Sequence, residues 1–584
     1  MTGQQRRPGN ENNILIGAAV GIVIAVVAVI YIPTQLYARL LSEQGQWITP
    51  ANPVAVIPRV IRGQLPWTLL HTVMAVLVVL AIVGLVMVWI SDQARKQARR
   101  DHIHSKARLM GSGKGMDRAA AVDKVATGNL AGSDISPGFM LAKTVVKSRE
   151  LWASWRDSVC MLAGPGGGKT TSVAVPLILS APGSVFVTGN KRDISDIIRA
   201  DRSARGQYWK FDPQQIASTA GEPAAPWYWD VLSYVTDETK AHQLAALFAA
   251  NDKEDGAKSD PFFDAEGPAL LSRLLHAAAL DHKYISQVFT WLASAEFRSA
   301  VKILNTHGFP LSAAAVDGVE RIRGSDQGIG IIGTAMKSIR FLDNRQAVRW
   351  IQPSGPDDDR PQFDPRQFVR APSDTLVSLS KEGNGSFGPI TAAMVMAVLD
   401  AAEEFAEREG GGRMPVPLLG MLDEAANICK IPDLPKKYSY YGSYGIFLVT
   451  ILQNWSQGVL TWGEHGMSQL WSASTVGLVG AGIKDEKFLG AISKGVGDHY
   501  APQYSRSRSS GRNASTSTSD SFKETPILTI AELQAMPPGT MVVSAMGHPP
   551  VMAKGVPYWQ RGEQMAASCE QSRKAYGPQA VDAL

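Results

Sequence analysis

The segment SVCMLAGPGGGKTTSVAVPLIL, residues 158–179, has the residue types and the spacing of a phosphate-binding loop. Gly168, Lys169 and Thr170 match the end of the pattern G-x-x-x-x-G-K-[ST], and the loop glycines lack the Cβ atoms that would hold a phosphate away from the backbone. We expect Lys169 to neutralise the β- and γ-phosphates of a nucleotide and the Thr170 hydroxyl to bind Mg²⁺. The residues expected to contact the nucleotide are Gly164, Pro165, Gly166, Gly167, Gly168, Lys169, Thr170 and Thr171.

The usual first glycine of this pattern is replaced by Ala163, five residues before Gly168. Alanine is the smallest side chain that can stand there, and the apolar strand before the loop and the helix after it are both predicted. We therefore expect a working nucleotide site; the alternative is a glycine-rich turn with a chance Lys-Thr pair. A second stretch, GSGKG at 111–115, is not expected to bind nucleotide, because no apolar strand precedes it and no Ser or Thr follows Lys114.

Two further polar positions stand at the ends of apolar strands. The segment VPLLGMLDE, 416–424, ends in Asp423, expected to hold Mg²⁺ through its water shell, and Glu424, expected to polarise the attacking water. The segment GIFLVTILQ, 445–453, ends in Gln453, which we expect to sense the γ-phosphate. The alternatives are a pair of solvated carboxylates and a strand-end cap. Together with Lys169, Glu424 and Gln453 are the expected catalytic residues.

The elements that must position these residues alternate between short apolar strands and helices. Helices are expected after Lys169, over 191–206 and over 389–408. This alternation predicts a parallel sheet covered by helices on both faces. The expected strands are 158–164, 183–189, 207–213, 375–380, 416–424, 445–453 and 474–480.

A long segment separates the two halves of the expected site, since Lys169 and Asp423 are 254 residues apart (423 − 169). Within it, residues 238–345 contain no convincing strand, whereas 262–281 and 284–304 have helical spacing. We interpret 238–345 as an all-helical insertion in the nucleotide-binding domain. We expect it to contact the molecule on which that domain acts, by protein recognition more than by DNA binding. Four acidic residues of the insertion either bind a basic surface of that molecule or belong to a solvated loop: Asp252, Glu254, Asp255 and Asp260.

The C-terminal third has two further features. Residues 503–522 are rich in serine and poor in apolar residues, which predicts a mobile loop or linker. After them, a short helix and the hairpin GTMVVSAMGHPPVMAKG, 539–555, are expected to close the edge of the sheet.

Two uncharged apolar runs, Ile14–Ile32 and Trp67–Ile90, each have about the length needed to cross a hydrocarbon core of roughly 30 Å as a helix. The alternatives are a buried core helix and, for the first run, a signal peptide. The positive excess lies on the side of the termini, so both termini are expected to be cytoplasmic and 33–66 to face outward. The basic residues on the terminal side are Arg6, Arg7, Arg95, Lys96, Arg99, Arg100, Lys106, Arg108, Lys114 and Arg118, against Arg39, Arg59 and Arg62 between the runs.

Charge and cysteine content narrow the function classes. The formal net charge is only +5, and the basic run after the second span favours contact with a membrane surface over a nucleic-acid site. Cys160, Cys429 and Cys569 form no close pair, so neither a zinc site nor a disulfide framework is predicted. Free thiols suit a reducing cytoplasm.

As a set, these motifs resemble the type IV coupling proteins, the TraG-like ATPases of conjugation and type IV secretion. The similarity extends over nearly the whole chain in the family's order. It rests on the two spans and on GPGGGKTT, VFVTGNKRDI, YWKFDP, DPFFDAEGPALLSRLLHAAA, LLGMLDEAANI, TILQNWSQ and MPPGTMVVSAMGHPPVMAKGVPYW.

The resemblance implies an α/β fold, a RecA-like or FtsK-like P-loop NTPase with an inserted all-α domain, preceded by two transmembrane helices. It implies ATP and Mg²⁺ as cofactors, a hexameric ring and a multi-pass position in the inner membrane. It also implies delivery of relaxase-bound single-stranded DNA or effector proteins to a type IV secretion channel. The expected domains are an anchor, 1–92, a juxtamembrane linker, 93–140, the ATPase domain, 141–237 and 346–560, the insertion, 238–345, and a C-terminal tail, 561–584.

Two other functions stay open. An FtsK-like double-stranded DNA translocase would typically end in a winged-helix DNA reader, whereas this chain ends in a hairpin and a short tail. A docking receptor that binds ATP without hydrolysing it is disfavoured by the retained site residues. The segment KKYSYYGSYGIFLVTILQ, 436–453, departs from the family by having no arginine before the glutamine strand, so the residue that reaches a neighbour's nucleotide is unassigned, with Arg340 and Arg345 as weak candidates.

Overall fold

The structure is a computed structural model. It describes residues 28–36, 56–63, 67–126, 135–219, 221–252, 260–355, 357–381, 386–508 and 516–578. The chain forms two units, 1–102 and 103–584, which are described separately below.

The first unit contains one helix that is long and apolar enough to cross a membrane, among the residues described there. This stretch, Leu69–Leu109, contains an 18-residue window with a mean hydropathy of 3.1, of which only 6% is buried. Helix α3, Leu69–Ser105, forms most of it and includes most of the predicted second span, 67–90. The predicted first span, 14–32, lies outside the described residues except for 28–32, which are helical.

The second unit is built on an eleven-stranded sheet with the order β2-β1-β13-β12-β9-β3-β8-β7-β4-β6-β5. The strands from β9 to β5 in this order all run parallel, as predicted from their continuous apolar sequences. The parallel strands are β3 (Val159–Leu162), β4 (Val185–Gly189), β5 (Tyr208–Phe211), β6 (Thr375–Leu379), β7 (Leu418–Asp423), β8 (Ile446–Leu452) and β9 (Val476–Gly480). All seven predicted strands are therefore present.

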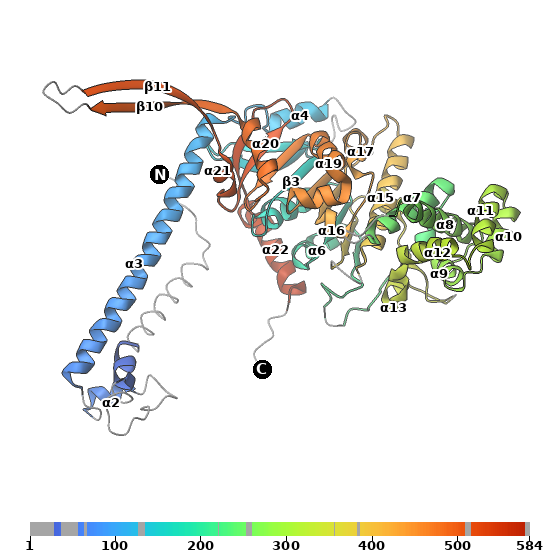
Figure 1. Ribbon diagram of the computed structural model, residues 1–584, viewed down its shortest axis with the longest axis horizontal. Coiled ribbons are helices and arrows are strands. Elements are labelled where there is room, and N and C mark those ends of the chain that lie inside the picture. Colours follow the sequence, from blue (N-terminus) through green and yellow to red (C-terminus); the bar gives the residue numbers. More distant parts are fainter. Residues whose placement is uncertain are drawn as a thin grey trace. The chain divides into compact units, whose positions relative to one another are not determined.

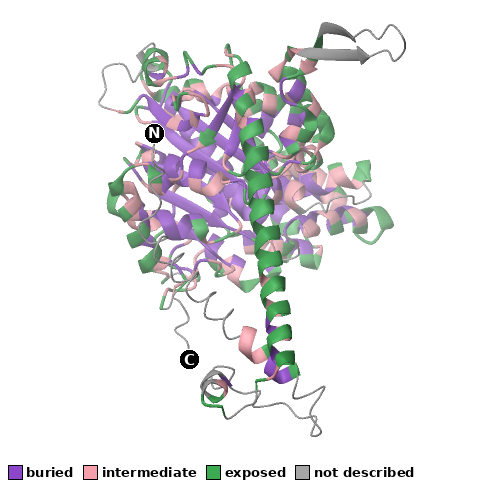
Figure 2. Ribbon diagram, turned by 90° about the vertical axis from the view of Figure 1, so that its left-hand side faces the viewer, coloured by how far each residue is buried: buried purple, intermediate pink, exposed green. Residues whose placement is uncertain are grey.

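Helices cover both faces of this sheet, and alternate residues of a strand belong to opposite cores. On β3, Cys160 and Leu162 pack into one core with α15 and α19, while Val159 and Met161 pack into the other with α5, α6 and α22. Figure 2 shows the buried strands inside this unit and exposed residues toward its outer surface. The helices that cover the sheet are α5 (Val175–Ser180), α6 (Asp193–Arg205), α15 (Gly388–Arg408), α19 (Trp455–Ala473) and α22 (Glu563–Tyr576).

The predicted C-terminal hairpin is present, but it does not close the sheet. Strands β12 (Thr540–Ala545) and β13 (Val551–Gly555) pair antiparallel, and β13 then pairs with β1 (Gly138–Thr144), which pairs with β2 (Glu150–Ser154). The prediction of an edge at β13 was wrong because β13 keeps a second row of unpaired backbone groups that the 138–154 hairpin satisfies. That hairpin mixes polar and apolar residues, so its sequence carries a weak strand signal.

The prediction of a loop or linker at 503–522 is also wrong for the described residues, which form strands. Strands β10 (Asp498–Arg508) and β11 (Thr516–Pro526) form a separate antiparallel ladder. Figure 1 shows this ladder extending away from the eleven-stranded sheet. A low apolar content excludes a buried face, but it does not exclude backbone pairing between two polar strands. Tyr500 and Phe522 on this hairpin are 68% and 73% exposed.

Between β5 and β6 the described residues contain helices and no named strand. Helices α9 and α10 divide the segment 284–304, predicted as one helical stretch, because Ala295 adopts the left-handed conformation (φ 52°). The elements here are η4 (Val231–Tyr234), α7 (Glu238–Asp252), α8 (Pro261–Leu280), α9 (Ile285–Ser294), α10 (Arg298–Thr306), α11 (Pro310–Arg321), α12 (Asp326–Ser338), η5 (Arg340–Asp343), α13 (Arg345–Ile351) and α14 (Pro365–Arg370).

Short elements complete the unit. The short helix predicted before the hairpin is α21, whose N-terminus has a capping box between Thr529 and Glu532. The remaining elements are η2 (Lys106–Leu109), α4 (Arg118–Ala126), the π-helical turn η3 (Thr170–Ala174), α16 (Ala425–Ile428), α17 (Leu434–Lys437), α18 (Tyr441–Tyr444), α20 (Glu486–Val496), α21 (Ile530–Gln534) and η6 (Tyr558–Gln560).

Candidate nucleotide site

The glycine-rich loop after β3 turns tightly and leads directly into a helix. Gly166 and Gly168 have φ angles of 73° and 85°, which residues with a Cβ rarely adopt. The Gly167 N–H donates to the Gly164 carbonyl (3.1 Å), and the Ser172 N–H donates to the Gly168 carbonyl (2.9 Å), where the first helical turn begins. Pro165 and Gly166 at the tip of the loop are exposed, so an anion has access to the loop.

Ala163 is accommodated because a glycine stands opposite it. Ala163 is fully buried at the end of β3, and a Cβ built on Gly480 of β9 would lie 2.7 Å from the Ala163 Cβ. Since Gly480 has no Cβ, the space that the Ala163 methyl needs is free. The next residue, Gly164, is held by a hydrogen bond from its N–H to the Ala481 carbonyl (2.9 Å).

Three of the predicted catalytic side chains meet at the carboxyl ends of β7 and β8. Lys169 Nζ lies 3.1 Å from Glu424 Oε1, although the two residues are 255 positions apart. Gln453 Nε2 donates to the same oxygen (2.8 Å). Asn427 Nδ2 donates to Glu424 Oε2 (3.3 Å). The carboxylate of Glu424 is thus buried and held from both oxygens.

The backbone of Glu424 is strained as well. Its φ of 57° lies in the left-handed region, which costs a residue with a Cβ of order 1 kcal/mol. This conformation turns the chain directly from β7 into α16. The hydrogen bonds of the Glu424 carboxylate with Lys169, Gln453 and Asn427 help to hold the residue in this strained conformation.

Asp423, the last residue of β7, has the properties of a cation ligand. Its Oδ1 is buried without a hydrogen-bond partner in the described structure. Burial raises the pKa of Asp423 to about 7; Lys169 opposes this rise, and the Glu424 and Asp193 carboxylates add to it. A buried carboxylate oxygen without a partner fits Mg²⁺, which prefers hard oxygen ligands. The Thr188 hydroxyl donates to the Asp423 carbonyl (2.9 Å) and so ties β7 to β4.

Sequence reasoning missed Thr188, Asp193 and Asn427. Thr188 stands at the carboxyl end of an apolar strand, which was the same signal that identified Gln453. Asn427 follows Glu424 by three residues, the spacing of one helical turn.

The other predicted residues differ in their environment. Thr171 Oγ1 donates to the Gly168 carbonyl at 3.5 Å, and Thr170 stands beside it at the start of η3. Arg340 and Arg345 are both exposed, on η5 and α13. Lys114 of the GSGKG stretch is exposed too. The described residues hold no group of three or more His, Cys, Asp or Glu side chains that could bind a metal by themselves.

Two family models match the chain. Residues 122–306 match "Type IV secretory system Conjugative DNA transfer", and residues 417–538 match "TraM recognition site of TraD and TraG". The first match includes the glycine-rich loop, and the second includes Asp423, Glu424 and Gln453.

Curated relatives are similar at low identity. The chain is 22% identical over 423 residues to the conjugal transfer protein TraG of Rhizobium radiobacter, covering 71% of this chain and 63% of that protein. It is 22% identical over 438 residues to the type IV secretion system-coupling protein VirD4 of Bartonella quintana, covering 72% and 65%. The chain thus spans slightly less than two thirds of the length of these relatives.

Solved structures with a similar arrangement include the plasmid coupling protein TrwB in complex with ADP and Mg²⁺. That likeness has a TM-score of 0.49 and 16% identity, over 70% of this chain and 88% of that chain. VirB4 of Thermoanaerobacter pseudethanolicus gives a TM-score of 0.40 and 14% identity, over 74% and 98%.

Proposed function

The chain is a member of the type IV secretion coupling protein family, and from that premise we propose that it is a membrane-anchored ATPase. It recruits relaxase-bound single-stranded DNA, effector proteins or both, and drives them to a type IV secretion channel. The observation that carries the ATPase proposal is the meeting of Lys169, Glu424 and Gln453 beside Asp423. The matched family model is named for conjugative DNA transfer, and the Bartonella quintana relative is named a type IV secretion system-coupling protein. These names support DNA as a cargo and a type IV secretion channel as its destination.

The proposed site binds ATP through the backbone of residues 164–171 and the ammonium of Lys169. Thr170 and Asp423 are the residues that would hold Mg²⁺, which supplies positive charge at the β- and γ-phosphate oxygens. The unpartnered Oδ1 of Asp423 supports this assignment.

Glu424 has two roles in this proposal. In the structure, its Oε1 accepts hydrogen bonds from both Lys169 and Gln453. When a γ-phosphate attracts Lys169, one of these bonds breaks, and Oε1 can accept a proton from the attacking water. Gln453 then orients that water or the γ-phosphate. In this proposal Glu424 is thus both the ion-pair partner of Lys169 and the general base.

The anchor is proposed to consist of the predicted span 14–32 and helix α3, with both termini in the cytoplasm of an inner-membrane protein. The hydropathy and exposure of Leu69–Leu109 support the second span. We propose a hexamer as the working assembly, in which a neighbour's cation completes the site; exposed Arg340 and Arg345 remain the candidates for it. The helical insertion, 238–345, is proposed to be the part that meets cargo.

The proposal is tested by transfer of cargo from donor cells that lack the native gene. Cells complemented with the wild-type chain should transfer cargo, and cells with Lys169→Ala should not. Lys114→Ala is the matched control, because Lys114 also follows a glycine but lies in a stretch that we do not expect to bind nucleotide. Transfer by Lys169→Ala at the wild-type frequency would contradict the proposal.

A further inference from the structure

Helix α7, the first helix of the insertion, is joined at two places to the segment that follows Glu424. We propose that Asn251 of α7 is a positioning residue for Glu424, through which the helical insertion controls the rate of ATP hydrolysis. This inference rests on the proposed ATPase function and concerns the regulation of the same site.

The first junction is the Asn251 side chain. Its Nδ2 donates to the Lys430 carbonyl (2.8 Å), and its Oδ1 accepts from the Lys430 N–H (3.1 Å). The same Nδ2 also donates to the Leu247 carbonyl (2.8 Å), one turn earlier in α7. A side-chain amide has both a donor and an acceptor in this geometry. Asn251 can therefore bind the N–H and the carbonyl of Lys430 while it remains hydrogen-bonded to its own helix.

Lys430 lies two residues beyond α16, the short helix that follows Glu424. In α16, the N–H groups of Asn427 and Ile428 donate to the Glu424 carbonyl (2.9 and 3.1 Å), and the Cys429 N–H donates to the Ala425 carbonyl (3.2 Å). Asn427 also holds the Glu424 carboxylate. A displacement of Lys430 therefore reaches Glu424 through a single helical turn. Because Glu424 is in a strained backbone conformation, it depends on such contacts.

Close packing leaves little freedom around this junction. A Cβ added to Gly388, at the start of α15, would lie 3.4 Å from both Asn251 Oδ1 and the Ile428 carbonyl. A methyl group at position 388 would therefore touch both Asn251 and the end of α16, so the three segments lie close together at this point. A movement of α7 must be transmitted to α16 or must break the Asn251 hydrogen bonds.

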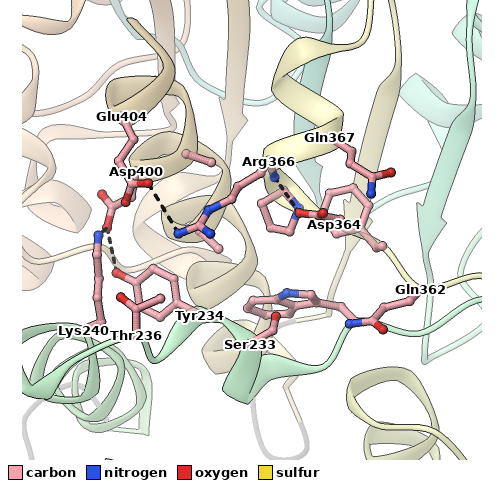
Figure 3. A pocket seen from close by; sticks show the side chains of 15 residues that line it. Ser233, Tyr234, Thr236, Lys240, Gln362, Asp364, Arg366, Gln367, Asp400 and Glu404 are labelled. Carbon is pink, nitrogen blue, oxygen red and sulfur yellow. Dashed lines mark hydrogen bonds and ion pairs between the residues drawn. The ribbon is translucent and has the colours of Figure 1, made fainter. Parts of the chain in front are cut away.

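The second junction lies at the other end of α7. Asp400 of α15 binds Lys240 of α7 through Oδ2 (2.5 Å) and Lys437 of α17 through Oδ1 (3.2 Å), and Tyr234 donates to Oδ2 (2.7 Å). Burial alone would raise the pKa of Asp400, but Lys437 and Lys240 outweigh it and keep this pKa below its ordinary value. Figure 3 shows Lys240 and Tyr234 meeting Asp400 at the side of a cavity of about 340 Å³.

Residues 430 and 437 are consequently the two ends of a segment that α7 fixes, directly at 430 and through Asp400 at 437. This segment lies between Glu424 and β8, and β8 leads to Gln453. Helix α7 is therefore placed to pass a change in the insertion to both catalytic side chains that hold the attacking water.

The test uses the full-length chain in detergent and the variants Asn251→Ala and Asn251→Asp. Asn251→Asp keeps the shape of the side chain but loses the N–H donors to Lys430 and Leu247. We expect each variant to lower kcat for ATP hydrolysis by about tenfold or more while KM for ATP stays within about twofold, because Glu424 is displaced and the phosphate loop is not. The matched control is Asn305→Ala in α10, an exposed asparagine of the same insertion, which should keep the wild-type kcat.

Hydrogen–deuterium exchange provides a second measurement that does not need hydrolysis. The amides of residues 427–429 should exchange about tenfold faster or more in both Asn251 variants than in the wild type and in Asn305→Ala. A wild-type kcat in Asn251→Ala, or a raised KM with unchanged kcat, would overturn the inference. If the wild-type chain hydrolyses no ATP, the proposed function fails by itself, and unchanged exchange in the Asn251 variants would then overturn the positioning role separately.

Discussion

Gly480→Ala should disturb the nucleotide site without touching any nucleotide-binding residue. The new Cβ would lie 2.7 Å from the Ala163 Cβ and 3.6 Å from the Ala163 Cα. Two methyl groups in ordinary contact are about 3.5–4 Å apart, so the overlap is roughly 1 Å. Ala163 directly follows β3 and Gly480 ends β9, its parallel neighbour. The three atoms nearest to the new Cβ belong to Ala163 and to the Leu162 carbonyl, so no flexible side chain can move aside.

The size of the effect follows from this overlap. Overpacking of a well-packed core typically costs about 1–3 kcal/mol, and we expect Gly480→Ala to reduce the free energy of unfolding by that amount. Ala163→Gly alone should cost about 1 kcal/mol, because it removes one buried methyl group. Combined with Gly480→Ala, Ala163→Gly should restore stability, with a favourable coupling of about 1–3 kcal/mol in the double-mutant cycle.

The assay is urea unfolding of the full chain and of the three variants in detergent, together with the affinity for an ATP analogue. Gly480→Ala should also weaken nucleotide binding, because the start of the phosphate loop must shift. Gly490→Ala in α20 is the control: its methyl group would meet only Ile530 Cδ1, at 3.7 Å, and a helical Gly→Ala change should be neutral or stabilising by up to about 1 kcal/mol. Wild-type stability of Gly480→Ala, or a double variant no better than the single one, would refute this account of Ala163.

Three further predictions concern buried charge and topology. Burial raises the folded-state pKa of Asp423 to about 7, so its contribution to the free energy of unfolding should be full below about pH 4 and should be lost as the pH rises through 7. Asp423→Asn should therefore flatten the dependence of the free energy of unfolding on pH across this window, and an unchanged slope would contradict the assignment. Asp400→Ala removes the carboxylate that pairs with Lys240 and one of the two that pair with Lys437, and should lower the free energy of unfolding by about 3–5 kcal/mol. Asp433→Ala, which removes an exposed ion pair, should cost under about 1 kcal/mol in the same urea titration. The three native cysteines are buried and should give little background labelling. A cysteine introduced at Gln46 should then react with an impermeant thiol reagent on intact cells, and one introduced at Ser519 should not; the reverse labelling would overturn the proposed topology.

Much of the sheet could be predicted from sequence because parallel strands are buried on both faces. Segments such as 416–424 and 445–453 are continuously apolar, and their polar residues mark the carboxyl ends where side chains of neighbouring strands meet. The same logic brought Lys169, Glu424 and Gln453 into one site across more than 250 residues of chain. The π-helical first turn after the loop has no such signal.

The missed parts depend on pairing and packing rather than on local pattern. The 138–154 hairpin is short and partly polar, and it is a strand pair only because β13 offers a free edge. The 498–526 segment is poor in apolar residues, so its sequence shows no alternation of apolar and polar positions that would predict two strands. Asn251 is one polar residue at the end of a helix, and its hydrogen bonds to Lys430 cross 179 positions to a backbone group, so nothing in the sequence distinguishes it.

The most direct test of the central claim is ATP turnover by the purified full-length chain and by Glu424→Gln. The wild type should hydrolyse ATP, and Glu424→Gln should bind ATP but hydrolyse it at least about a hundredfold more slowly, because an amide cannot accept the proton of the attacking water. Turnover by Glu424→Gln at the wild-type rate would remove Glu424 from the mechanism. ATP binding without any turnover in the wild type would contradict the ATPase account and identify a docking receptor instead.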